Sequence, residues 1–203
     1  FVDVAYANIV GYTEELLENE YDTVAEIQAV IEAVNGGQTF AALVAELKDA
    51  ANQVERFNVL EREFDNVYAE LMDNYQGKFD DYSQYTEKDD IQLDINEVNV
   101  DADIAALDLA KLNDLENLSE VIEDLTLPVA GKYGTTITWE VDENDYLTEE
   151  GKVTRPANVV GDKTITLTAT VAIGEEELEV EEQTDVSVTI KKLDAAKSIY
   201  AFE

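Results

Sequence analysis

The chain has 203 residues with no cysteine and no histidine, and its 47 acidic and 13 basic residues give a formal net charge of −34. Disulfides, thiolate zinc sites and histidine-based catalysis are therefore excluded, and binding to nucleic acid or to an anionic membrane is disfavoured. No apolar run approaches the roughly 18 residues that span a bilayer, so we expect no direct membrane insertion.

The acidic residues are spread evenly along the chain. Residues 1–100 hold 23 acidic and 5 basic residues, and residues 101–203 hold 24 and 8. The two halves therefore carry −18 and −16, which makes the charge a property of the whole surface and not of an acidic tail. The chain begins at Phe1 without a methionine or a leader-like segment, so we expect it to be a piece of a longer protein.

Residues 1–75 predict four helices, because apolar residues recur there at helical spacing. Thr23 with Glu26 predicts a capping box for the second helix, Thr39 can cap the third, and Asn58 with Glu61 opens the fourth. Short connections between such helices are typical of an antiparallel bundle. The apolar positions are Tyr6, Ile9, Val10, Leu16 and Leu17; Val24, Ile27, Val30, Ile31 and Val34; Phe40, Leu43, Val44, Leu47, Ala51 and Val54; and Leu60, Phe64, Val67, Leu71 and Tyr75.

The segment after Gly77 allows two interpretations. Thr86 with Asp89 can cap a fifth helix through residues 91–98, yet Ile91, Leu93 and Ile95 also alternate like a strand. We predict a helix.

From about residue 130 the apolar period changes from helical to two, which predicts half-buried strands. Ile137 and Trp139 share one face of the first strand, with threonines on the other, and residues 165–171 repeat the pattern. We expect a hairpin near Gly174, between residues 164–173 and 178–180, and a last strand over residues 186–190.

Four short motifs occur here in a fixed order: Leu127-Pro128, Thr138-Trp139, Thr154-Arg155-Pro156 and Thr168-Ala169-Thr170. In this order they resemble the atrophied type of bacterial Ig-like domain, over roughly residues 104–191. The helical half resembles spacer units of bacterial surface-layer (S-layer) proteins in its residues 23–31. The helical stripes and this resemblance together predict an α+β protein of two domains, with an N-terminal helical bundle (residues 1–100), an antiparallel Ig-like β-sandwich (101–192) and a connector to a following module (193–203).

Oxygen-rich side chains suggest calcium, a hard cation that takes several oxygen ligands. One run follows Asp94 and a second follows Asp142, and neither has the spacing of an EF-hand loop. The alternative is that cations screen the acidic surface without an ordered site. The candidate ligands are Asp94, Asn96, Asn99, Asp101, Asp103, Asp142, Asn144 and Asp145.

Other candidate sites have structural interpretations that we prefer. Trp139 could stack on a sugar, but its parity with Ile137 predicts a core position. We expect Arg155 to pair with a nearby carboxylate. Carboxylate pairs suited to a glycosidase are so numerous among 47 acidic residues that they single out no catalytic residue.

The sequence therefore predicts a non-enzymatic structural segment of an extracellular bacterial protein, in the cell wall or S-layer. It would act as a spacer and assembly module that associates with itself or with neighbouring modules through cation-dependent contacts. The alternative is an accessory module of a secreted polysaccharide-active enzyme or an adhesin, with cell-wall glycan as a partner. Saturable sugar binding that is lost on changing an exposed tyrosine would favour this alternative.

Overall fold

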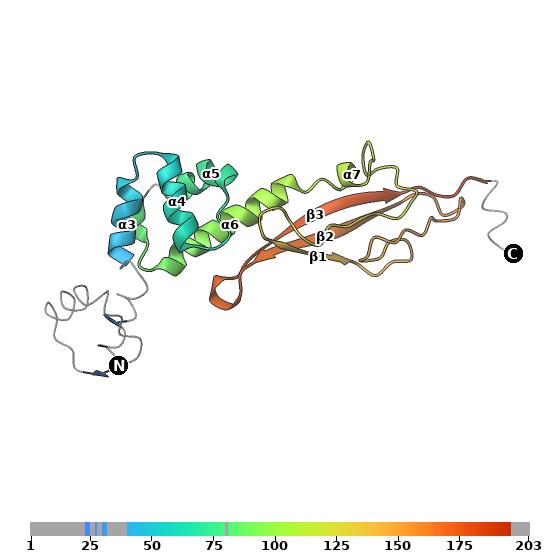
Figure 1. Ribbon diagram of the computed structural model, residues 1–203. Coiled ribbons are helices and arrows are strands. Elements are labelled where there is room, and N and C mark those ends of the chain that lie inside the picture. The colour runs from blue at the N-terminus through green and yellow to red at the C-terminus, as the bar shows by residue number, and fades with distance from the viewer. Residues whose placement is uncertain (1–22, 25–26, 28–29, 32–39, 80, 196–203) are drawn as a thin grey trace.

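The computed structural model describes residues 23–24, 27, 30–31, 40–79 and 81–195. Helices come first and a three-stranded antiparallel sheet follows, so the α+β class is confirmed (Figure 1). The helices are α3 (Phe40–Asp49), α4 (Gln53–Glu63), α5 (Met72–Lys78), α6 (Lys88–Ala106) and α7 (Leu109–Leu112), with 3-10 turns at Ala69–Leu71, Tyr82–Gln84 and Glu176–Leu178. The strands are β1 (Thr136–Val141), β2 (Lys163–Ile173) and β3 (Val180–Ile190).

The first predicted helix lies outside the described residues, as does most of the second. Of the second helix, Val24, Ile27, Val30 and Ile31 are helical, and Ile31 is buried. The cap predicted at Thr39 also lies outside the described part of the chain.

The third predicted helix is shorter than its apolar stripe suggested. α3 buries Leu43 and Leu47 but ends at Asp49. Asn52 then begins α4, because its side chain accepts a hydrogen bond from the Glu55 N–H over 3.1 Å. Val54 therefore belongs to α4 and is 69% exposed, so its assignment to the third helix was wrong.

The prediction of one helix over residues 58–75 was also wrong, because the chain breaks there. α4 ends at Glu63, and Asn66 takes a left-handed conformation with φ of 56°, which a helix interior does not tolerate. The chain becomes helical again at α5. Phe64, Leu71 and Tyr75 are nevertheless buried in one hydrophobic cluster. The apolar pattern therefore predicted correctly which side chains are buried, but it wrongly predicted a single uninterrupted helix.

The fifth segment is a helix and not a strand. Its start is fixed by Asp90, whose carboxylate accepts hydrogen bonds from the backbone N–H and the hydroxyl of Thr86 over 2.7 and 2.9 Å. α6 continues to Ala106, beyond the predicted end at Val98. The boundary predicted between residues 100 and 101 therefore lies inside this helix.

The sheet has the order β1-β2-β3, and its inner face follows the predicted alternation. Trp139 lies opposite Ala169 and Ile137 opposite Val171, and all four are buried. The hairpin at Gly174 (φ 90°) is confirmed. β3 is one continuous strand, whereas we expected two; the polar residues 181–185 hide its apolar period from the sequence.

The described residues form one regular sheet where a full sandwich would have two. The other side of the core is covered by the end of α6, by α7 and by irregular chain, which adds isolated bridges from Val121 to Ile190, from Ala130 to Thr136 and from Leu147 to Val153. The predicted β-sandwich therefore differs from the structure in its second layer, which is not a regular sheet among the described residues. Side-chain packing and single bridges hold this layer in place.

The helices and the sheet lie one after the other along an elongated molecule (Figure 1). The buried residues form two hydrophobic clusters, one among the helices and one beneath the sheet. α6 contributes to both, with Ile91, Ile95 and Val98 in the helical cluster and Val100 in the cluster beneath the sheet. The division into two separate domains stays a prediction.

Candidate functional site

Three polar side chains on one face of α6 are almost completely buried. Asn96, Asn99 and Asp103 are exposed by 2%, 0% and 4%, and their spacing of three and four residues places them in a row. We call these three residues the polar seam. Because a buried polar group without a partner is costly, the partners of the polar seam show what the helix holds in place.

Asn96 binds the hairpin between β2 and β3. Its amide nitrogen donates to the backbone oxygen of Leu178 over 2.8 Å, and its amide oxygen accepts from the Gln92 side chain over 3.0 Å. This contact joins residues that are 82 positions apart in the sequence.

Asn99 binds the break between α4 and α5. Its amide nitrogen donates to the Asn66 backbone oxygen over 2.8 Å, and the Tyr75 hydroxyl donates to its amide oxygen over 2.6 Å. Burial raises the pKa of Tyr75, so its hydroxyl stays protonated and remains a donor. The left-handed turn at Asn66 is thereby fixed from inside the protein.

Asp103 binds the loop that leads into β1. Its carboxylate accepts hydrogen bonds from the backbone N–H groups of Lys132 and Tyr133 over 2.8 and 2.9 Å, and from the Thr135 hydroxyl over 2.9 Å. Three donors satisfy the buried charge, as a carboxylate in this position requires.

The loop over residues 131–135 also touches the helical part of the chain directly. The rings of Tyr68 and Tyr133 meet edge to face with centroids 5.3 Å apart, and Lys132 pairs with Glu70 over 2.7 Å. The hydrogen bond from Lys132 lowers the pKa of Glu70. This ion pair is exposed on both sides, so the aromatic contact and the polar seam contribute more to the junction.

The structure does not gather the eight predicted calcium ligands into one group. In the run that follows Asp94, Asp94 itself accepts a hydrogen bond from the Tyr85 hydroxyl and Asp101 is exposed. The other three candidate ligands of this run form the polar seam. In the second run, Asn144 accepts from the N–H groups of Tyr146 and Leu147, with Asp142 and Asp145 exposed beside it. Within the described ranges, no three acidic side chains are placed to hold a metal ion.

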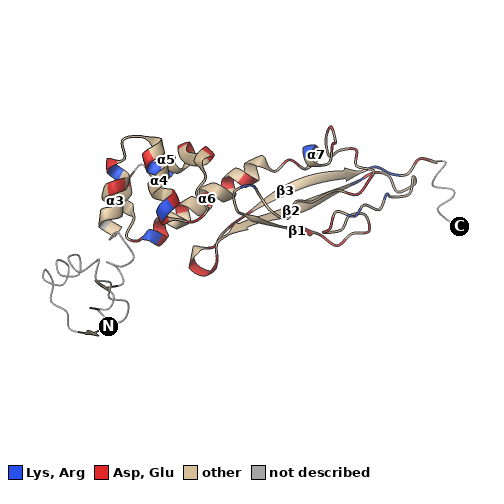
Figure 2. Cartoon of the chain, in the orientation of Figure 1, with Lys and Arg blue, Asp and Glu red and all other residues tan. Residues whose placement is uncertain are grey.

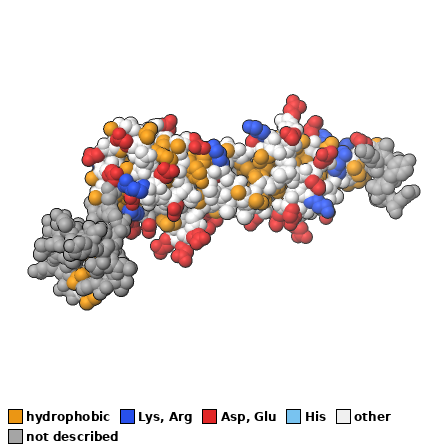
Figure 3. Space-filling model, in the orientation of Figure 1, with side chains coloured by type: hydrophobic (Ala, Val, Ile, Leu, Met, Phe, Trp, Pro, Cys, Tyr) orange, Lys and Arg blue, Asp and Glu red, His pale blue; other side chains and the backbone are white. Residues whose placement is uncertain are grey.

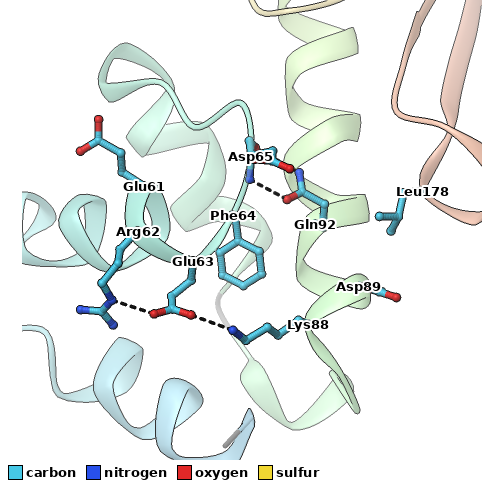
Figure 4. Close-up of a pocket in the computed structure, with 9 residues that line it drawn as sticks. All are labelled: Glu61, Arg62, Glu63, Phe64, Asp65, Lys88, Asp89, Gln92 and Leu178. Atoms are coloured by element: carbon cyan, nitrogen blue, oxygen red, sulfur yellow. Dashed lines mark hydrogen bonds and ion pairs between the residues drawn. The ribbon is translucent and has the colours of Figure 1, made fainter. Parts of the chain in front are cut away.

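Figure 4 shows a shallow depression where α4 meets the start of α6. Two ion pairs of the Glu63 carboxylate lie in it. Glu63 accepts from Lys88 and from Arg62, each over 2.7 Å. The Lys88 hydrogen bond, followed by that of Arg62, lowers the pKa of Glu63, so the carboxylate stays ionised. A carboxylate held in this way suits a structural ion pair better than a proton donor. The depression is lined by Glu61, Arg62, Glu63, Phe64, Asp65, Lys88, Asp89, Gln92 and Leu178.

The predicted pairing of Arg155 with a carboxylate was wrong. Its guanidinium donates to the backbone oxygens of Lys191 and Lys192, directly after β3. The Leu193 N–H donates to the Pro156 backbone oxygen over 2.8 Å, and the Asp162 carboxylate accepts from the Lys192 N–H over 2.9 Å. These contacts fix the direction in which the chain leaves the sheet.

Trp139 occupies the core position that its parity predicted. It is 8% exposed, and its indole N–H donates to the Pro128 backbone oxygen over 2.8 Å. The partner satisfies the only polar atom of the ring, so the whole side chain is used for packing.

Sequence reasoning singled out Asn96, Asn99 and Asp103 but gave them the wrong partners. It placed Tyr75 only in an apolar stripe and missed the hydrogen bond that its hydroxyl donates to Asn99. One signal was available: the three polar residues share a helical face next to the apolar stripe of Ile91 and Ile95. Polar residues at that position are buried, and buried polar residues need partners within the protein.

Residues 100–193 match the family model of the atrophied bacterial Ig domain. The match begins in the last turns of α6 and covers the whole sheet, so this part of the chain is an Ig-like domain, as its motifs predicted. No curated protein matched the chain. A bacterial Ig-like domain suggests a surface or extracellular protein. In the described part of the chain, no helix has both the length and the apolar character needed to cross a membrane.

Proposed function

We propose that this chain is a structural, non-enzymatic segment of a bacterial cell-surface protein of the S-layer type. It holds neighbouring modules at a fixed distance and orientation, and it meets its neighbours through contacts that depend on cations. One observation carries the proposal: α6 runs without a break from the helical cluster into the Ig-like domain and is fixed to both by buried polar side chains.

A shared helix makes a stiffer junction than a loop. α6 has 19 residues and is therefore about 28 Å long at ~1.5 Å per residue. Bending the junction would break the contacts of Asn99 and Asp103, and each donor or acceptor left buried without a partner costs about 1–3 kcal/mol. Rotation between the two parts is thus opposed by both packing and hydrogen bonds.

The two ends of the described chain favour a spacer as well. α3 and the end of β3 lie at opposite ends of the molecule (Figure 1). At the end of β3, Arg155 and Asp162 hold the departing backbone at Lys191 and Lys192. Modules attached at the two ends would therefore be kept apart and at a defined angle.

The surface charge supports contacts through cations. Acidic side chains are spread over the helices, the hairpin and the loops beside the sheet (Figures 2 and 3). With a net charge of −34, two such surfaces repel each other within the Debye length of roughly 8 Å at physiological salt. Screening or bridging cations remove this repulsion, and the many carboxylate oxygens suit calcium.

The stiffness can be measured with spin labels, since the chain has no cysteine of its own. Lys48 on α3 and Val159 beside the end of β3 are exposed and suitable for substitution by cysteine. Double electron–electron resonance between the two labels should give a single narrow distance distribution. Asp103→Ala should broaden it, whereas Asp101→Ala, on an exposed position of the same helix, should not. A broad distribution in the unaltered chain would contradict the spacer role.

A further inference from the structure

One edge of the sheet is open along most of β3. On the side away from β2, Thr189 donates to the Leu118 backbone oxygen over 2.8 Å and accepts from the Val121 N–H over 3.0 Å. Successive residues of a strand point their backbone groups to opposite sides, so every second residue before Thr189 also faces away from β2. These residues are Glu181, Gln183, Asp185 and Ser187.

The outward backbone groups of these four residues have no hydrogen-bond partner in the part of the chain that the structure describes. All four residues are exposed, and so is Glu182, which lies on the inner face. We call residues 181–187 the open edge. An edge of this kind is a template for another strand, because its N–H and C=O groups can continue the ladder.

We propose that a second copy of this chain pairs with the open edge in antiparallel orientation, with Thr184 on the two-fold axis, to form one continuous six-stranded sheet. The two copies use the same residues, as a two-fold interface requires. The inference deepens the proposed assembly role by naming its surface and its partner.

Side-chain charge selects this register. With Thr184 on the axis, Glu181 lies opposite Ser187 of the second copy, and Gln183 lies opposite Asp185 of the second copy. No carboxylate lies directly opposite another. The Gln183 amide lies opposite the Asp185 carboxylate of the second copy; within one chain, Gln183 donates to the Thr170 hydroxyl and Asp185 accepts from the Thr168 hydroxyl, which leaves the second amide hydrogen and the second carboxylate oxygen for the contact. This register also uses all four outward residues, because the open edge is centred on residue 184.

The neighbouring registers are disfavoured by like charges. Moving the axis to Gln183 places Glu181 opposite Asp185 of the second copy, and moving it to Asp185 places the two Asp185 side chains opposite each other. Like charges directly opposite each other destabilise a strand pair. The acidic residues therefore disfavour these two slipped registers and permit the centred arrangement.

The pairing should depend on salt. In the centred register Glu181 and Asp185 of the second copy are diagonal neighbours about 7–8 Å apart, and each chain carries a net charge of −34. Both repulsions weaken as the ionic strength rises. The chain should therefore be monomeric at low salt and dimeric at high salt.

Sedimentation velocity from 50 mM to 1 M sodium chloride, at constant protein concentration, tests the proposal. Ser187→Glu puts a carboxylate opposite Glu181 twice in the dimer and should raise the dissociation constant by roughly tenfold; Ser187→Lys should lower it by a similar factor. The control is Thr166→Glu, which adds the same charge on the β2 residue paired with Ser187, away from the open edge, and should change little. Thermal melts would show that each variant is folded.

A second variant tests the backbone contacts. Gln183→Pro removes an outward N–H and leaves the ladder to β2 intact, so it should weaken the dimer without unfolding the sheet. In hydrogen exchange, the amides of Gln183 and Asp185 should be protected in the dimer and exchange freely in the monomer. A chain that stays monomeric at every salt concentration, with Ser187→Lys included, would overturn the proposal and show that the carboxylates only keep edges apart. Equal dimerisation of all variants would place the interface elsewhere. Neither outcome affects the distance distribution that tests the spacer role.

Discussion

The Asp103 carboxylate fills the space that a side chain at position 131 would need. A Cβ built on Gly131 would lie 2.2 Å from Asp103 Oδ2 and 2.3 Å from Thr135 Oγ1, and both atoms belong to the hydrogen bond that joins α6 to the loop before β1. Gly131 is thus required by close approach of the loop to the helix. The junction between the helical part and the sheet therefore requires a residue without a side chain at position 131.

Gly131→Ala should therefore destabilise the protein by about 1–3 kcal/mol, since the loop must move away from a fully satisfied carboxylate. Gly77→Ala is the matched control: nothing lies within 4 Å of its added Cβ, and the residue is in α5. This control should be neutral or stabilise by up to about 1 kcal/mol, because alanine is the better helix former. Urea unfolding of both variants gives the comparison, and equal midpoints would show that the loop has room to yield.

Tyr75→Phe should destabilise the protein by about 1–3 kcal/mol, because Asn99 Oδ1 loses its 2.6 Å donor in a buried site. Tyr82→Phe is the control from the same hydrophobic cluster. The Tyr82 hydroxyl is buried without a hydrogen-bond partner among the described residues, so its removal should be neutral or stabilising. Thermal unfolding followed by circular dichroism distinguishes the two. If both variants lost the same stability, the hydrogen bond from Tyr75 to Asn99 would make no separate contribution to the free energy of unfolding.

Glu63→Gln should destabilise the protein by about 1 kcal/mol or less at neutral pH, where it breaks the contacts to Lys88 and Arg62. These contacts lower the pKa of Glu63 in the folded state, so its contribution is complete above the ordinary glutamate value of 4.5. This contribution to the free energy of unfolding is lost as the pH falls through the lowered pKa of Glu63 in the folded state. The difference in midpoint between the variant and the parent should thus be constant from pH 8 to pH 5 and should shrink below pH 4.5.

Glu61→Gln is the control for this titration. Glu61 is exposed on the same helix, and its substitution removes the same charge. It should be neutral or slightly stabilising at neutral pH, because it relieves repulsion within a chain of net charge −34. A midpoint difference for Glu63→Gln that persisted at pH 3 would contradict the ion-pair explanation.

The unfolding midpoint should rise with millimolar calcium and with molar sodium chloride, because both reduce repulsion among the carboxylates. Differential scanning calorimetry at three conditions (low salt, added calcium and high sodium chloride) checks this. Isothermal titration with calcium separates screening from an ordered site, which would give saturable binding that Asp142→Asn or Asp145→Asn reduces. An unchanged midpoint in all three conditions would contradict the role assigned to the acidic surface.

Local patterns in the sequence predicted the inner face of the sheet correctly. Trp139, Leu167 and Val171 are buried where a period of two placed them, because that period depends only on the geometry of an extended backbone. The turn at Gly174 was also local, since its residues lie within a few positions of one another. The cap predicted near residue 86 was wrong by one residue, because Asp90 and not Asp89 accepts the hydrogen bonds at the start of α6. The even charge of −34 needed no structure at all.

Only the tertiary structure decided what the polar residues of α6 do. Asn96, Asn99 and Asp103 find partners 82, 33 and 32 residues away, and apolar periodicity carries no information on such distances. A row of amides and carboxylates has the same sequence whether it binds a metal ion or a neighbouring loop. The choice depends on which backbone groups the rest of the chain brings to the helix, and here it brings N–H and C=O groups that bind all three.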